Sequence, residues 1–152
     1  MPQASLENLR EPAAIQEQLR RIQRAINDDP ALAVGSAKEL IESTAKVVLI
    51  ERGHAVDERA DLPALVKEAQ QALALHPSSM TPGPDGTEAV RKILGGVSSV
   101  AIGVAELRTG LSARHTHLAV NAAITWRQLM LDTLADPSAP WHAGYIAKLT
   151  WT

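Results

Sequence analysis

The stretch DPALAVGSAKELIESTAKVVLIERG, residues 29–53, contains the clearest helix signal in the chain. Asp29 is suited to cap a helix and Pro30 fits its first position, while Gly53 is suited to end it. Between these residues, apolar side chains recur every three or four positions, as they do on one face of an α-helix. The segment therefore predicts a long helix.

Four more segments follow the same period, and no segment has a strong strand signal. The predicted helices run over residues 12–26, 29–53, 61–75, 87–107 and 116–134, and the Pro/Gly/Ser-rich residues 76–86 predict a loop. The fold class is therefore all-α, a bundle of about five main helices. The predicted core includes Leu40, Val47, Leu65, Leu94, Val97, Leu107, Ala119 and Trp126.

The composition favours close packing of helices. Hydrophobic residues make up 45% of the sequence, yet Phe and Cys are absent and aromatic residues account for only 3%. Small aliphatic side chains suit helix packing, and Gly95-Gly96 costs the fourth helix about 1 kcal/mol per glycine, which a close contact with another helix would offset.

Charge and hydropathy narrow the classes of function. A net charge of -2 argues against a broad surface for nucleic acid, although a local basic patch is compatible with it. Without cysteine there is no disulfide, thiolate metal site or thiol nucleophile. The first residues do not resemble a signal peptide and no run approaches the roughly 20 apolar residues of a membrane span, so we expect a cytoplasmic protein without a membrane partner.

The chain divides into three parts in this interpretation. Residues 1–27 form an N-terminal helix, residues 28–136 form the main helical domain, and residues 137–152 form a tail. The tail contains Trp141, Tyr145 and Trp151, which is most of the aromatic content, so we expect it to pack on the bundle.

Five blocks of the main domain carry a family resemblance. They are AVGSAKELIES (33–43), DLPAL (61–65), ILGGV (93–97), AELR (105–108) and HLAVNAA (117–123). In this order they resemble the C-terminal domain family of bacterial abortive-infection (phage-resistance) proteins, whose fold is similar to the HEPN (higher eukaryotes and prokaryotes nucleotide-binding) helical bundle. The resemblance implies a HEPN-like domain that often forms homodimers and that, in many members, is a metal-independent ribonuclease.

The resemblance also implies a site. In those ribonucleases an Arg and a His, four to six residues apart, lie at a junction between two helices and face the same pair on a second subunit. Arg108 and His115 match this spacing as catalytic residues, with Arg114 and His117 as candidates for substrate binding. The family usually places Asn after the arginine and ends a glycine-rich turn with His-Gly, and this chain has neither feature.

Arg108 and His115 have suitable chemistry for cleaving RNA without a metal. Histidine can take and return a proton near neutral pH, and the arginine fork fits phosphate oxygens. Alternatively, Arg108 only caps the fourth helix while His115 and His117 lie in the first turn of the next.

Two functions therefore stay open: a phage-defence endoribonuclease, or a catalytically silent module for dimerisation or for binding a ligand or partner. Neither function requires a metal or a cofactor. We expect a homodimer, with RNA, a sensor domain or a partner protein as further partners.

Overall fold

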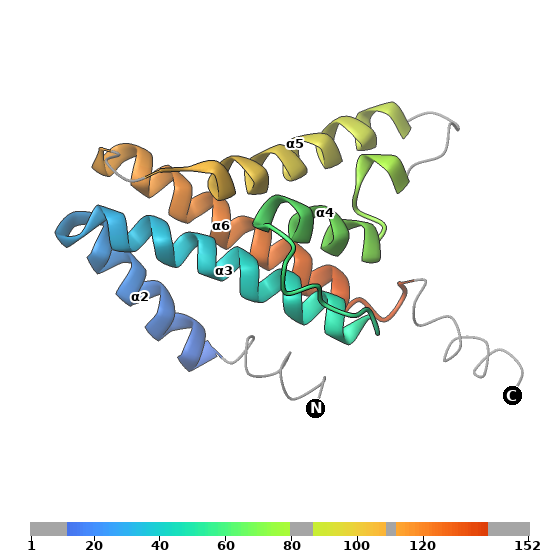
Figure 1. Cartoon of the computed structure of the whole chain (residues 1–152), viewed down its shortest axis with the longest axis horizontal. Helices are drawn as coiled ribbons and strands as arrows, with labels where there is room; N and C mark the ends of the chain where they lie inside the picture. The colour runs from blue at the N-terminus through green and yellow to red at the C-terminus, as the bar shows by residue number, and fades with distance from the viewer. Residues whose placement is uncertain (1–11, 80–86, 109–111, 140–152) are drawn as a thin grey trace, which may run out of the picture.

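The computed structural model describes residues 12–79, 87–108 and 112–139, and these residues form five α-helices (Figure 1). The helices are α2 (Pro12–Asp28), α3 (Pro30–Glu51), α4 (Leu62–Ala72), α5 (Thr87–Glu106) and α6 (Ala113–Leu134), with a short 3-10 turn, η1 (Pro77–Ser79). No strand occurs in the described ranges. The predicted all-α fold is confirmed.

Helices α3 and α6 lie side by side at the centre of the bundle, and their contact is the most extensive between any two elements. Helix α2 packs on one side of this pair, and α4 and α5 cover the other side (Figure 1). This arrangement leaves α5 at the outside of the bundle, in contact with α3, α4 and α6.

Local signals fix the helix ends as the sequence predicts. The Asp29 carboxylate accepts a hydrogen bond from the Leu32 backbone N–H at 3.1 Å and so caps α3. Asp61 caps α4 in the same way. Gly53 has a φ of +76°, a conformation that favours glycine, and it follows the last turn of α3.

Two predicted helix boundaries differ from the structure by three residues. Helix α4 ends at Ala72 and not at Leu75. Helix α6 begins at Ala113 and not near Thr116, because the Ser112 side chain caps it. His115 therefore lies in the first turn of α6, as the alternative interpretation expected.

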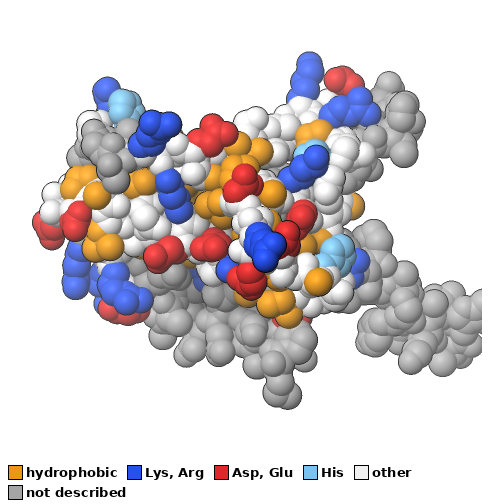
Figure 2. Space-filling model, in the orientation of Figure 1, with side chains coloured by type: hydrophobic (Ala, Val, Ile, Leu, Met, Phe, Trp, Pro, Cys, Tyr) orange, Lys and Arg blue, Asp and Glu red, His pale blue; other side chains and the backbone are white. Residues whose placement is uncertain are grey.

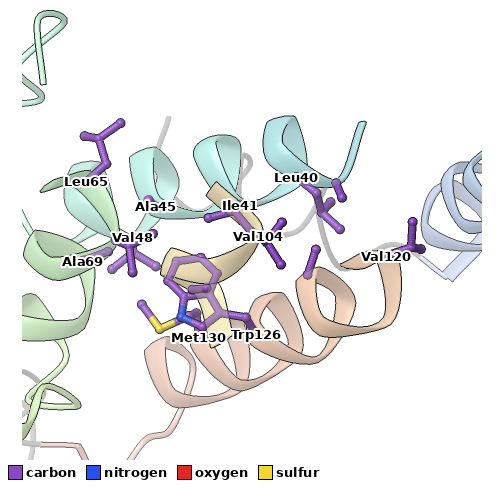
Figure 3. Close-up of a cluster of buried hydrophobic side chains, with 14 of the residues drawn as sticks. Leu40, Ile41, Ala45, Val48, Leu65, Ala69, Val104, Val120, Trp126 and Met130 are labelled. Carbon is purple, nitrogen blue, oxygen red and sulfur yellow. The ribbon is translucent and has the colours of Figure 1, made fainter. Parts of the chain in front are cut away.

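The core is built around Trp126 and Met130, which point from α6 toward α3 (Figure 3). The buried Trp126 indole N–H donates to the Gln70 side-chain oxygen at 3.3 Å, and the Gln70 amide donates to the Leu75 carbonyl at 3.1 Å. This pair satisfies polar atoms that would otherwise be costly to bury, and it joins α4 to α6.

Most of the predicted core is confirmed. The buried members are Leu40, Leu65, Leu94, Ala119 and Trp126, whereas Val47, Val97 and Leu107 are half-buried. Trp141, Tyr145 and Trp151 lie outside the described residues, so the predicted packing of the tail stays a prediction.

Candidate functional site

The predicted site residues flank the connection between α5 and α6. Arg108 follows α5, and Arg114, His115 and His117 belong to the first turns of α6. All four side chains are exposed. Figure 2 shows Lys, Arg and His side chains gathered at this end of the molecule. Residues 109–111 of the connection itself lie outside the described ranges.

Ser112 orients His115. The Ser112 hydroxyl oxygen accepts a hydrogen bond from the His115 backbone N–H at 3.4 Å, and it lies 3.2 Å from Nδ1 of the same residue. The contact leaves Nε2 as the ring nitrogen that faces away from Ser112. Ser112 was not among the predicted site residues, although a serine three residues before a candidate histidine is a typical helix-capping signal.

Lys38 holds the end of α5. Its ammonium, on α3, donates to the Leu107 carbonyl, across 69 positions of sequence. A cation is favourable there because the last carbonyls of a helix lack partners within the helix and carry partial negative charge. The alternative interpretation gave this role to Arg108, but the contact that the structure describes comes from Lys38.

A groove of about 440 Å³ lies between the second half of α5 and the first half of α6. Its lining is mostly apolar: Ser99, Val100, Gly103, Val104, Leu107, His115, Leu118, Ala119 and Ala122. Of the four predicted site residues, only His115 belongs to the lining; Arg108, Arg114 and His117 do not. The groove therefore does not unite the Arg-His pair.

Helix α5 carries a second apolar face on its outer side, which we call the outer seam. It consists of Ala89, Ile93, Gly96, Val100, Gly103 and Leu107, all exposed except the half-buried Leu107. Ile93 is 65% exposed and Val100 is 45% exposed, while Leu118 of α6, across the groove, is 66% exposed. All three side chains were predicted as apolar positions of their helices, but the helical period alone does not distinguish the two faces of α5.

Other features of the described residues suggest no competing site. Two further hollows, of about 420 and 400 Å³, contain none of the predicted site residues. The described residues include no group of three or more His, Asp or Glu side chains able to hold a metal ion. Among them, no helix is long and apolar enough to cross a bilayer.

Comparison with known proteins identifies the family. The family model Abi_C, described as a HEPN-like domain, matches residues 13–134, which is most of the chain. The chain belongs to the Abi_C family. This match to Abi_C confirms the predicted resemblance and covers the five described helices except for Pro12, the first residue of α2. No curated protein and no solved structure matches the chain.

Proposed function

We propose that this Abi_C domain acts in the cytoplasm, in phage defence, as a catalytically silent helical module that binds a protein partner through the outer seam and the adjoining groove. The observation that carries the proposal is the row of exposed apolar residues along α5, in which Ile93 and Val100 are the large side chains. Single exposed apolar residues are ordinary on a protein surface, but a continuous row of them is typical of a binding surface. Ile93 and Val100, at 65% and 45% exposure, are seven residues apart on that row.

The composition of the groove supports binding over catalysis. Cleavage of RNA without a metal needs a base, an acid and a fixed cation near the reacting phosphate. Among the described residues of the lining, His115 alone is ionisable, and Arg108 lies outside the groove. A lining of Val, Leu, Ala and Gly suits an apolar side chain better than a phosphate.

A second candidate is the metal-independent endoribonuclease, with Arg108 and His115 as catalytic residues and Arg114 and His117 as contacts for RNA. The specific observation in its favour is the contact of Ser112 with His115 Nδ1, which would leave Nε2 directed at a substrate. A ribonuclease of this type would cut RNA in the presence of a chelator.

Phage plating on bacteria that express the protein separates these two functions. The binding role predicts that Val100→Glu abolishes protection, since a charge would be buried in the contact, while an Arg108→Ala, His115→Ala double variant protects like wild type. Gln71→Glu is the matched control, because it adds the same charge at an exposed position of α4. Loss of protection in the Arg-His double variant together with full protection by Val100→Glu would instead favour the ribonuclease, and cleavage of RNA by the purified protein in the presence of a chelator would then test it.

A further inference from the structure

Helix α5 has two apolar faces, and the bundle covers one of them. Leu94, Ala101 and Val104 are buried in the bundle. The outer seam repeats with alternating steps of four and three residues, from Ala89 to Leu107. This is the heptad spacing by which one helix packs along another. Within the described part of the chain, no helix covers the outer seam.

The glycines of the seam point to a close approach by another backbone. A glycine in the middle of a helix costs roughly 0.5–1 kcal/mol relative to alanine. A Cβ built on Gly96 or Gly103 would meet nothing within 4 Å, so no contact inside the described chain requires a glycine at either position. Both positions would instead let a second helix pack closely on α5.

We propose that the partner is a second copy of this chain, with the two α5 helices antiparallel about a two-fold axis at the level of Ser98. This inference rests on the proposed binding role and names its partner. In this register the large residues of one seam face the small residues of the other. Ile93 faces Gly103 of the second copy, Val100 faces its Gly96, and Leu107 faces its Ala89. The seam is thus complementary to itself in size, as a two-fold interface requires.

The groove between α5 and α6 provides the binding site for one of these large residues, Ile93 of the second copy. Gly103 lies in the groove lining together with Val100, Leu107 and Leu118. Opposite Gly103, Ile93 of the second copy enters the groove and covers its apolar lining. The same operation places the second Ile93 in the second groove, so both exposed isoleucines become buried.

The charges beside the seam fit the same register. Lys92 and Glu106 are both exposed and immediately precede Ile93 and Leu107, so they lie on the same side of the seam. In the antiparallel pair, Lys92 of each copy approaches Glu106 of the other, giving two ion pairs of opposite charge. A parallel two-fold pair would place these residues of the two copies on opposite sides of the seam, so neither ion pair could form.

This register keeps the two Arg-His pairs apart. Arg108 follows Ser98 by ten residues, and a helix rises 1.5 Å per residue, so the two Arg108 positions are separated by about 30 Å along α5. A catalytic site shared across the two-fold axis would need the axis to pass near the end of α5 instead. The predicted dimer therefore has no composite Arg-His site.

Disulfide trapping tests the register directly, because the chain has no cysteine of its own. The Ile93→Cys, Gly103→Cys double variant is expected to form a covalent dimer under mild oxidation. The two cysteines of one chain cannot pair, because ten helical residues separate them by about 15 Å, and a disulfide needs Cα atoms within about 7 Å. Either single variant should remain uncrosslinked for the same reason. Absence of the double-variant dimer would overturn the register.

Leu107→Cys locates the axis independently. In the proposed register, the two Leu107 positions are about 27 Å apart and do not crosslink. A covalent dimer of this single variant would place the axis at the Arg-His end and overturn the proposal.

A second variant guards against failure to fold. Gly103→Leu occupies the space that Ile93 of the second copy would fill, and the open space around Gly103 allows it to fold with a melting temperature no lower than that of the monomeric Val100→Glu variant. Light scattering should then give a monomer, and a dimer of this variant would count against the register.

If the wild type is monomeric but Val100→Glu still abolishes phage protection, the partner is another protein, and only this inference fails. If Val100→Glu also leaves protection intact, the proposed binding role fails as well.

Discussion

Replacing the two seam glycines by alanine should make the fold more stable. The Gly96→Ala, Gly103→Ala double variant removes about 0.5–1 kcal/mol of helix penalty per site, so the free energy of unfolding should rise by about 1–2 kcal/mol. The new methyl groups cause no clash, since a Cβ at either position meets nothing within 4 Å. For a chain of this size, the gain corresponds to a rise of about 2–8 °C in melting temperature.

Gly53→Ala is the matched control, because it also has open space around its Cβ but has a φ of +76°. Alanine in this left-handed conformation costs about 1–2 kcal/mol, so this variant should melt at a lower temperature. Melting temperatures are measured by circular dichroism with Val100→Glu present in every variant, so that all the compared proteins are monomers and association does not affect the result. A double-alanine variant that melts at or below its parent would refute the reasoning, because it would mean that both glycines are needed inside the monomer.

Three further predictions concern the bundle itself. Gln70→Ala leaves the buried Trp126 indole N–H without its acceptor and should lower the unfolding free energy in urea by about 1–3 kcal/mol, whereas the exposed Gln71→Ala should change it by less than about 0.5 kcal/mol. Equal effects would exclude a role for the buried hydrogen bond. Burial, and to a lesser extent the charge of Lys67, lowers the pKa of His76 below 6.5 in the folded protein. The folded state therefore favours neutral His76. The resulting contribution to stability is complete above pH 6.5 and is lost as the pH falls through the pKa that His76 has in the folded state. His76→Asn should therefore reduce the drop in urea midpoint between about pH 7.5 and about pH 5, and an undiminished drop would assign it to other groups. Lys38→Met removes the donor to the carbonyl at the end of α5 and should speed amide hydrogen exchange in the last turn of that helix; unchanged exchange would show that the contact does not hold it.

The sequence predicts helix ends well where a single side chain decides them. The signals at these ends are local: Asp29 and Asp61 each cap a helix with a carboxylate hydrogen bond, and Gly53 adopts a left-handed φ. Each acts within three or four residues of itself, so its effect can be predicted without knowledge of the tertiary structure. Family and fold class follow from the order of such local blocks. The late prediction for the start of α6 arose because the Ser112 cap was overlooked.

The two faces of α5 could not be separated from one sequence. Ile93 and Leu94 are equally apolar neighbours, yet the first is exposed and the second is buried, because only the packing of α4 and α6 decides which side faces inward. The hydrogen bond between Gln70 and Trp126 could not be predicted from the sequence either, since 56 positions separate the two residues.

For the candidate site, the spacing of Arg108 and His115 directed attention to the junction of α5 and α6 but did not indicate the apolar character of the groove there. That character comes from Val100 and Leu118, which belong to different helices. The chemistry of a surface built by two elements depends on how they pack, and spacing within one segment does not contain that information.

The mass of the protein in solution tests the central claim, that two copies meet through the outer seam. Light scattering of wild type should give twice the 16.3 kDa chain mass, while Val100→Glu should give the mass of a single chain with its helical circular dichroism unchanged. A wild type that stays at the single-chain mass at every concentration, or a Val100→Glu variant that remains a dimer, would contradict the account.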